Sequence, residues 1–317
     1  MAAQNNASND SPNGVNSKSF GFIGLGIMGW GMAKNLRAKI PTESVLNVCE
    51  INKARLDEFI SSTPGRIQIC ESPLEVVQSS DVIITMLPRG EHVLQVFTNP
   101  KNDLLLTASG TKTFIDCSTI DVKNVKGSGR RGGKVRPGSS TPKVFDTIKP
   151  ILEKMGKPEN IFHCGGSGAG LATKLINNYL SAINMIGVCE GMNMGRLYGL
   201  DPVLLAGVIN SSTGMSRNSR EQNPVKGVSS VASSATDFEG GFSTELCHGV
   251  LQMSMELSEQ LGAKSMLAPV VRSMYDCAVQ SEKCQGKDFR SIYRLFSEEE
   301  GQELPVGSLN KVNGSKE

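Results

Sequence analysis

Short apolar runs alternate with segments of helical periodicity along the first 120 residues. The candidate strands are residues 20–25, 44–48, 66–70, 81–87 and 113–117. The helical segments between them are residues 28–36, 53–60, 74–77 and 91–97. Alternating strands and helices build a parallel sheet with helices on both faces. The pattern therefore predicts a doubly wound α/β domain.

The second half of the chain follows a different pattern. An amphipathic helix is expected at 143–154 and a short strand at 160–164, after which the periodicity is helical throughout. Residues 169–198 are apolar on most sides, which predicts a long, buried central helix. Asp201 is expected to cap the next helix. Later helices are predicted at 246–261, 266–280 and 289–296.

The chain of 317 residues is long enough for two domains, because single cores stop growing near about 250–300 residues. We expect a disordered tail at 1–18, an α/β domain at 19–165, an all-helical domain at 166–297 and a flexible tail at 298–317. Residues 121–141 interrupt the first domain with interleaved glycines and basic residues. They have too few apolar residues to form a core, which predicts an irregular basic loop. Contact with nucleic acid is the weaker alternative, since charge runs are usually solvated.

Composition adds mainly exclusions. The net charge is +2, and 38% of residues are hydrophobic, so no strong field favours nucleic acid or membranes as partners. Eight cysteines without a CxxC pair indicate buried thiols in a reducing compartment and no metal site. Residues 1–18 contain neither an apolar signal core nor arginine. This composition favours the cytosol over secretion or a mitochondrial transit peptide.

A GxGxxG string at residues 24–29 follows the first strand and opens the first helix. In that context Gly24 allows the tight turn, Gly26 lets the backbone approach a pyrophosphate, and Gly29 allows close helix–strand packing. Glu50 lies about 20 residues further on, where an acidic residue binds the adenosine ribose. The pattern predicts a Rossmann domain that binds NAD. NADP is less favoured because a carboxylate repels its 2′-phosphate, although Lys53 and Arg55 are nearby. A tight turn without a ligand is the alternative.

Two further sets of polar residues are candidates for chemistry. Ser118 and Thr119 follow the fifth strand, and ligands bind at the carboxyl ends of such strands. Lys174, Asn178 and Ser181 form one polar stripe on the long helix, because they are spaced at i, i+4 and i+7. Desolvation lowers a lysine pKa toward the range suited to acid–base catalysis. The alternatives are an ordinary strand-end turn and a lysine whose tip reaches solvent.

Four ordered blocks of sequence resemble the 3-hydroxyisobutyrate dehydrogenases, which are β-hydroxyacid dehydrogenases. The blocks are residues 22–29 with 32–36, 84–88, 114–121, and 168–170 with Lys174, Asn177 and Asn178. The resemblance covers roughly residues 19–120 and 141–297. It implies a Rossmann domain followed by a helical domain for substrate binding and dimerisation.

The resemblance also implies an activity, namely hydride transfer between NAD and a small 3-hydroxy acid. The expected reaction is 3-hydroxyisobutyrate to methylmalonate semialdehyde, in valine catabolism. Lys174 would move the hydroxyl proton, Asn178 would orient the substrate, and Ser118 and Thr119 would bind it. The residues implied to line the cofactor are Gly24, Leu25, Gly26, Ile27, Met28, Gly29, Glu50, Leu87, Pro88, His92 and Thr119. Relatives form homodimers or homotetramers, and a mitochondrial location is the family's alternative to the cytosol.

The chain departs from the family in two places. Residues 121–141 replace a helix, a strand and a Ser-Gly-Gly loop that binds the substrate carboxylate, and Arg131 precedes Gly132-Gly133. We therefore expect the sheet to lack one or two strands and to have an open edge. Gly249 and Val250 occupy the positions of a family Lys-Asp pair. These departures favour two alternatives: a catalytically impaired NAD-binding protein, or a reductase of another small aldehyde or imine.

Overall fold

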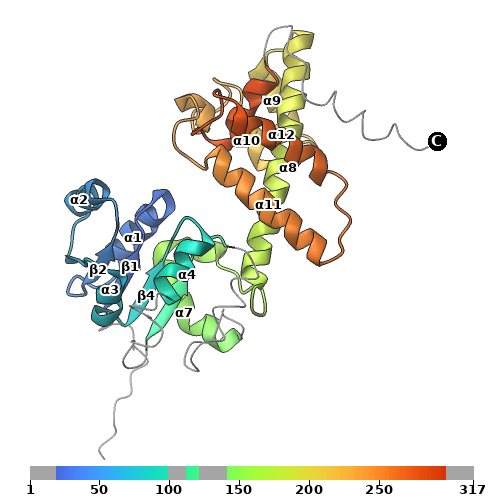
Figure 1. The fold of residues 1–317 in the computed structure, drawn as a ribbon. Coiled ribbons are helices and arrows are strands. Elements are labelled where there is room, and N and C mark those ends of the chain that lie inside the picture. The colour runs from blue at the N-terminus through green and yellow to red at the C-terminus, as the bar shows by residue number, and fades with distance from the viewer. Residues whose placement is uncertain (1–18, 99–111, 121–140, 298–317) are drawn as a thin grey trace, which may run out of the picture. The chain divides into compact units, whose positions relative to one another are not determined.

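The computed structural model describes residues 19–98, 112–120 and 141–297 (Figure 1). The chain divides into two compact units, Met1–Gly170 and Leu171–Glu317. The first unit contains the sheet, and the second is helical (Figure 1). The predicted fold class, a doubly wound parallel sheet followed by a helical domain, is confirmed. Within the described ranges, no helix is long and apolar enough to cross a membrane.

A parallel sheet forms the centre of the first unit. Its strands are β1 (Phe20–Ile23), β2 (Leu46–Cys49), β3 (Ile67–Ile69), β4 (Val82–Thr85) and β5 (Thr113–Asp116). In the described part of the chain their order is β3-β2-β1-β4-β5, and every neighbouring pair is parallel. From β1 the chain first adds β2 and β3 on one side of the sheet and then β4 and β5 on the other, so the strand order changes direction between β1 and β4. In sheets of this type a ligand binds beyond the carboxyl ends of the strands at such a switch point.

Helices cover both faces of this sheet. They are α1 (Ile27–Lys39), α2 (Lys53–Ser62), α3 (Pro73–Ser79), α4 (Gly90–Thr98) and α7 (Pro142–Met155). Residues of α1, α2 and α7 share one apolar cluster with Phe20 and Phe22 of β1. Residues of α3 and α4 pack in a second cluster with Ile23 and Ile83. Successive strand side chains point to opposite faces, so β1, β2, β4 and β5 each contribute to both clusters.

The strand predicted at 160–164 is wrong. Residues Pro158–Asn160 form a 3-10 turn, η1, and residues 161–165 are irregular. A strand needs a neighbour that accepts its backbone hydrogen bonds, and no described strand lies beyond β5 in the sheet order. The expected loop at 121–141 and the expected loss of strands fall mainly on residues 121–140, which lie outside the described residues.

The second unit is helical, as predicted. Its elements are α8 (Ala169–Tyr198), α9 (Pro202–Asn210), α10 (Arg217–Arg220), η2 (Ser233–Thr236), α11 (Thr244–Gln260), α12 (Ala268–Gln280) and η3 (Phe289–Leu295). Asp201 caps α9, because its Oδ1 accepts the Leu204 N–H at 2.8 Å. The last segment is a 3-10 helix, although its sequence suggested an α-helix.

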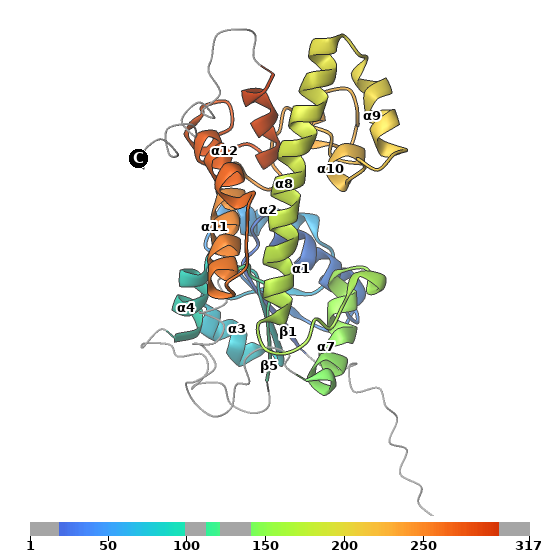
Figure 2. The same cartoon turned by 90° about the vertical axis from the view of Figure 1, so that its right-hand side faces the viewer.

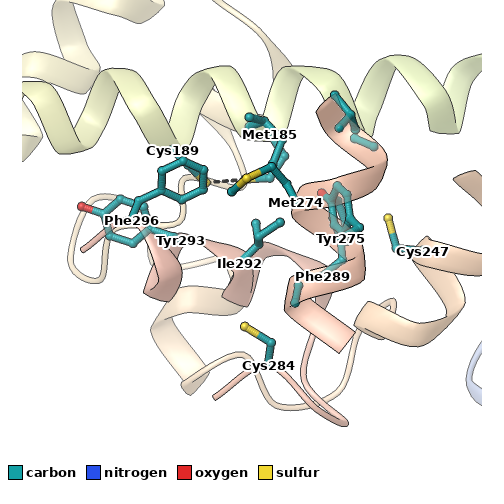
Figure 3. Close-up of a cluster of buried hydrophobic side chains, with 14 of the residues drawn as sticks. Met185, Cys189, Cys247, Met274, Tyr275, Cys284, Phe289, Ile292, Tyr293 and Phe296 are labelled. Carbon is teal, nitrogen blue, oxygen red and sulfur yellow. Dashed lines mark hydrogen bonds between the residues drawn. The ribbon is translucent and has the colours of Figure 1, made fainter. Parts of the chain in front are cut away.

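The core of the helical unit lies along one side of α8. Met185 and Cys189 of α8 pack with Cys247 of α11, Tyr275 of α12 and Phe289 of η3 (Figure 3). The expectation that α8 would be buried on most sides is wrong for this single chain. Met194, Leu197 and Tyr198 near its end are 66%, 70% and 83% exposed.

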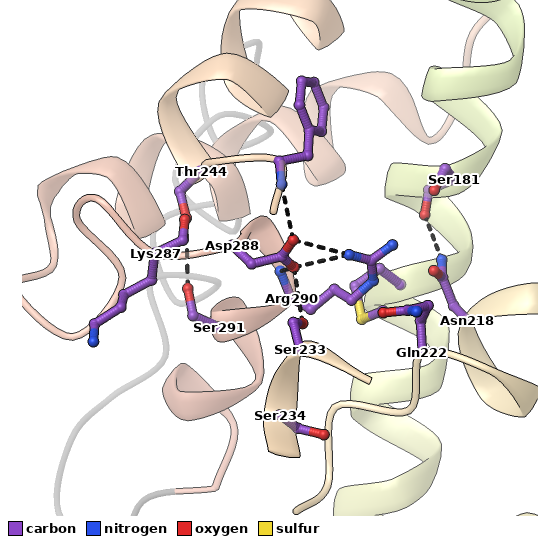
Figure 4. A network of polar contacts seen from close by, with 12 residues as sticks. Ser181, Asn218, Gln222, Ser233, Ser234, Thr244, Lys287, Asp288, Arg290 and Ser291 are labelled. Atoms are coloured by element: carbon purple, nitrogen blue, oxygen red, sulfur yellow. Dashed lines mark hydrogen bonds and ion pairs between the residues drawn. The ribbon is translucent and has the colours of Figure 1, made fainter. Parts of the chain in front are cut away.

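The buried carboxylate of Asp288 joins segments in the C-terminal part of the helical unit. Asp288 is 1% exposed and accepts hydrogen bonds from the Phe242 backbone at 3.0 Å and the Ser233 hydroxyl at 3.1 Å. Arg290 also contacts both of its oxygens, at 2.9 and 3.0 Å (Figure 4). Together these contacts tie three segments that are distant in sequence. Asp288 therefore has a structural role.

Most cysteines are buried and all of the described ones are free thiols. Burial raises the pKa of Cys49 and of Cys70 to about 11. Thiols with raised pKa values are poor nucleophiles. The interpretation of these cysteines as packing residues is therefore confirmed for the buried ones, whereas Cys164 is exposed.

Candidate cofactor and catalytic site

The three glycines of the β1–α1 turn have different surroundings. Gly24 has φ +95°, and a Cβ on it would overlap the backbone oxygen of Met86. A Cβ on Gly29 would overlap the backbone oxygen of Gly24. A Cβ on Gly26, by contrast, would meet no described atom within 4 Å. The fold itself requires glycine at positions 24 and 29 but not at 26. Open space in front of Gly26 is what the approach of a pyrophosphate needs, so this turn fits a dinucleotide.

The start of α1 is suited to an anion. Its N-cap is Gly26, which supplies no side-chain hydrogen bond, and its first turn contains no acidic residue. The first N–H groups of a helix have no partner within it, and the helix dipole adds positive potential there. Ile27 and Met28 are about 60% and 62% exposed at this end, whereas the Leu25 side chain is fully buried. Of these predicted cofactor contacts, Leu25 can offer only its backbone.

Glu50 and Arg55 hold Leu25 from both sides of its peptide. The Leu25 N–H donates to Glu50 Oε2 at 2.6 Å, and the Asn52 N–H donates to Glu50 Oε1 at 2.9 Å. Arg55 Nε donates to the Leu25 carbonyl oxygen, and the guanidinium lies 5.0 Å from the centre of the Trp30 ring. Glu50 is half-buried, and each carboxylate oxygen can accept a further bond. It can therefore fix the turn and still accept ribose hydroxyls.

The ends of β4 and β5 form the other half of this edge. Ser118 Oγ donates to Asp116 Oδ1 at 2.6 Å and accepts the Leu87 N–H at 2.9 Å. Predicted residues from two loops are thereby brought together. Pro88 is exposed and Thr119 is half-buried. His92 is half-buried at the start of α4, and its Nδ1 is a buried atom without a hydrogen-bond partner among the described residues.

The candidate acid–base residues lie in the other unit, on the first turns of α8. Asn178 and Ser181 are half-buried. Lys174 is accessible to solvent, and desolvation by the surrounding protein nevertheless lowers the pKa of its ammonium group. A lowered pKa makes the neutral amine available at lower pH, which is what a general base requires. Local packing orders this part of the helix, because Ser254 of α11 donates to the Leu175 carbonyl oxygen at 3.0 Å.

Sequence reasoning missed three residues of this region. Asn52 and Trp30 contact Glu50 and Arg55 beside the glycine turn. Asp116 anchors Ser118 at the other side. Its sequence signal was available, since an acidic residue ends the fifth strand.

Gly249 is exposed on α11 and a Cβ there would meet open space, whereas Val250 is buried. The described residues contain no group of three or more His, Cys, Asp or Glu side chains that could hold a metal ion.

Comparisons with known proteins identify similar sequences over both units of the chain. A family model described as the NAD binding domain of 6-phosphogluconate dehydrogenase matches residues 19–131. A second, described as NAD-binding of NADP-dependent 3-hydroxyisobutyrate dehydrogenase, matches residues 168–296. The chain is 32% identical to a probable mitochondrial 3-hydroxyisobutyrate dehydrogenase of Arabidopsis thaliana, over 91% of this chain and 90% of the relative.

Other relatives agree with this match. The human mitochondrial 3-hydroxyisobutyrate dehydrogenase is 34% identical, over 88% of this chain and 87% of its own. An NAD-dependent L-serine dehydrogenase of Pseudomonas aeruginosa is 29% identical, over 90% of this chain and all of its own. The crystal structure of Mycobacterium tuberculosis 3-hydroxyisobutyrate dehydrogenase with L-serine is 26% identical. It has a TM-score of 0.73 and covers 87% of this chain and 98% of its own.

Fold, glycine turn and matches together define an NAD(P)-binding dehydrogenase with a Rossmann domain and a helical domain. More particularly, the chain belongs to the 3-hydroxyisobutyrate dehydrogenase family. The predicted family is confirmed.

Proposed function

We propose that this protein oxidises 3-hydroxyisobutyrate to methylmalonate semialdehyde with NAD. The observation that carries the proposal is Lys174, whose pKa is lowered by desolvation and which is followed one helical turn later by Asn178. An amine in this state can accept the substrate's hydroxyl proton. The names of the relatives that are 32% and 34% identical over most of the chain support the choice of substrate.

In this reaction the main predicted residues would have separate tasks. When bound, the nicotinamide would accept the hydride from the carbon that bears the hydroxyl group. Lys174 would take the hydroxyl proton, and Asn178 would hold the substrate and the amine in line. The glycine turn and the first N–H groups of α1 would hold the pyrophosphate. Thr119 stays as a predicted contact to the substrate, whereas the Ser118 hydroxyl donates its proton to Asp116 and could only accept a hydrogen bond from a substrate.

The preference for NAD over NADP rests on Glu50. A 2′-phosphate at the adenosine ribose would meet this carboxylate, and like charges at close range repel. Arg55 has guanidinium N–H groups besides the Nε that is bonded to Leu25, so it could still attract such a phosphate. The proposed preference for NAD therefore depends on the carboxylate of Glu50 alone.

Two other functions stay open to test. A catalytically impaired NAD-binding protein is favoured by Gly249, where relatives would supply a lysine side chain. A reductase of another small aldehyde or imine is the second. Oxidation of L-serine belongs with the main proposal, because serine is also a small 3-hydroxy acid and one relative is named for this activity.

A substrate panel on the purified protein tests the proposal. 3-Hydroxyisobutyrate, L-serine and related acids are mixed with NAD or NADP, and the absorbance of reduced nicotinamide is followed. Turnover with 3-hydroxyisobutyrate and NAD, lost in Lys174→Ala, is the expected result. Cofactor binding by calorimetry without any turnover identifies the impaired protein. Turnover only in the reductive direction, with another acceptor, identifies the reductase.

We also infer that the protein forms a homodimer or homotetramer. Apolar side chains are exposed at the end of α8 and on α9, which lie beside each other (Figure 2). They are Met194, Leu197, Tyr198, Val203, Leu204 and Val208, each more than half exposed. Several exposed apolar side chains on adjacent helices are typical of interfaces between subunits.

The compartment is a separate question. Composition of residues 1–18 favoured the cytosol, whereas the Arabidopsis thaliana and human relatives are called mitochondrial, which weighs against it. The tail itself lies outside the described residues. The chain of 317 residues and a chain that starts at Ser19 are each expressed with a fluorescent protein at the C-terminus, and their locations in the cell are compared. Mitochondrial fluorescence from the longer chain alone would show that residues 1–18 are a targeting segment.

A further inference from the structure

The carboxylate of Asp116 is the centre of a hydrogen-bond cluster at the carboxyl end of β5. Its Oδ1 accepts the Thr85 hydroxyl at 2.8 Å, the Ser118 N–H at 3.1 Å and the Ser118 hydroxyl at 2.6 Å. Thr85 is fully buried and lies directly opposite Asp116 in the β4–β5 ladder. The carboxylate is therefore fixed from the rigid sheet on one side and bound to the loop on the other.

Ser118 passes this constraint on to a second loop. A hydroxyl has one proton to donate, and that of Ser118 goes to Asp116, so its lone pairs face the Leu87 N–H at 2.9 Å. Bonds to a charged acceptor are stronger than neutral ones. The chain Asp116–Ser118–Leu87 thus ties the turn after β4 to the end of β5.

The topology says which part of the cofactor this turn would meet. The glycine turn lies at the switch point between β1 and β4, and Glu50 marks the β2 side as the adenosine side. In a sheet of this order the two halves of the dinucleotide lie over opposite halves of the sheet. The nicotinamide half therefore falls over the ends of β4 and β5, where Leu87 and Ser118 lie.

We propose that Asp116 is a positioning residue that acts through Ser118 to hold the Leu87–Pro88 turn in place for the nicotinamide half of the cofactor. The proposal rests on cofactor binding by this edge of the sheet, and it gives Ser118 a task other than substrate binding. A substrate carboxylate could receive the Ser118 proton only by displacing Asp116, a negatively charged acceptor at 2.6 Å.

Two ligands separate the nicotinamide half from the adenosine half. NADH contains both halves, whereas ADP-ribose lacks the nicotinamide ring. Dissociation constants for both are measured by calorimetry on the full chain and on the variants Asp116→Ala and Ser118→Ala. We expect each variant to bind NADH about tenfold more weakly, the effect of losing one charge-assisted hydrogen bond. ADP-ribose binding should change by less than about twofold.

Three variants complete the design. Asp116→Asn keeps an oxygen that can accept the Ser118 hydroxyl, so NADH affinity should recover to within about threefold of the natural chain. The double variant Asp116→Ala/Ser118→Ala should bind NADH no more weakly than either single variant, because the two residues act as one chain. Asp201→Ala removes a capping carboxylate in the helical unit, and it should lower the melting temperature without changing either dissociation constant.

The outcomes are distinct. Equal weakening of NADH and ADP-ribose binding in the variants would mean a general structural role and would overturn the proposal, as would unchanged NADH affinity or additive losses in the double variant. If the natural chain bound neither ligand, the proposed dehydrogenase function itself would fail. A selective loss of NADH affinity, restored by asparagine, supports the positioning role.

Discussion

Gly24, Gly26 and Gly29 are one motif in the sequence but three different physical situations in the structure. Positions 24 and 29 leave no room for a side chain, and Gly24 also has a left-handed backbone. Gly26 has φ −58° and ψ −173°, a conformation open to alanine, and nothing described lies near its missing side chain. Fold and ligand binding can therefore be separated within a single turn.

Alanine at position 29 should lower the stability of the fold, whereas alanine at position 26 should weaken cofactor binding. Gly29→Ala forces a Cβ against the Gly24 backbone, and we expect a loss of about 1–3 kcal/mol in the free energy of unfolding. Gly26→Ala should change the free energy of unfolding by less than about 1 kcal/mol. It should nevertheless weaken NADH binding by more than about tenfold, because the Cβ occupies the approach to the pyrophosphate. Urea denaturation and calorimetry measure the two quantities. Normal NADH affinity in Gly26→Ala would show that the pyrophosphate does not lie against Gly26.

The pH dependence of turnover should report Lys174. The neutral amine is the base for oxidation, so kcat/KM should rise with pH through the pKa of Lys174 and then level off. Since desolvation lowers that pKa, the rise should be complete at a lower pH than a free lysine would allow. The reductive direction needs the ammonium form and should fall over the same range.

Lys174→Arg is the matched variant for this profile. Arginine keeps the charge but does not lose its proton in a protein. We expect kcat to fall by at least about 100-fold, the usual contribution of general acid–base catalysis, while NADH affinity stays within about twofold. A pH profile unchanged in Lys174→Arg would show that another group carries the proton.

At the scale of elements, the pattern of apolar residues predicted a helix or strand correctly where the element packs on other helices or strands. The five strands and α8 could be predicted from apolar runs, because each contributes apolar side chains to a core built of regular elements. The strand expected at 160–164 failed, because an apolar run says nothing about whether a pairing edge is present. The segment 289–296 failed in type only, since α and 3-10 turns share similar apolar spacings.

The site could be predicted less completely than the fold. Residue type and spacing were enough to select Gly26, Glu50 and Lys174. They could not show that Glu50 and Arg55 hold the Leu25 peptide, or that Asp116 binds Ser118, because these bonds join residues that only the folded sheet brings together. The exposed surface of α8 was also missed, because an apolar position does not reveal whether its own chain covers it.

Asp288 offers a test of how one buried group supports several elements. Asp288→Ala would leave Arg290 and two other donors without their acceptor, in a place that is 1% exposed. We expect the helical unit to lose about 3–5 kcal/mol in its free energy of unfolding. Urea denaturation followed by circular dichroism measures it. The comparison is Glu221→Ala, which breaks two exposed ion pairs and should have little effect. Similar losses in both variants would contradict the structural role of Asp288.

At the scale of the whole molecule, each of the two units has its own apolar core. The Rossmann unit supplies the candidate dinucleotide turn, and the helical unit supplies Lys174. The helical unit also exposes apolar side chains near the junction of α8 and α9. At that junction Gly195 and Leu205 are packed so closely that a Cβ on Gly195 would overlap the leucine. The two helices therefore pack directly against each other at the place where these apolar side chains are exposed.

Charge placed on this surface should prevent self-association. Leu204 and Val208 are 64% and 55% exposed on α9, so glutamate at both positions should not disturb the core. We expect the natural chain to sediment as a dimer or tetramer and Leu204→Glu/Val208→Glu as a monomer, because burying two carboxylates opposes association. Val231→Glu is the control, since Val231 is 72% exposed outside this surface, and it should leave the oligomer intact. A natural chain that is monomeric at micromolar concentration in analytical ultracentrifugation would refute the inferred oligomer. If Val231→Glu dissociated the oligomer and Leu204→Glu/Val208→Glu did not, the interface would lie on another face of the helical unit.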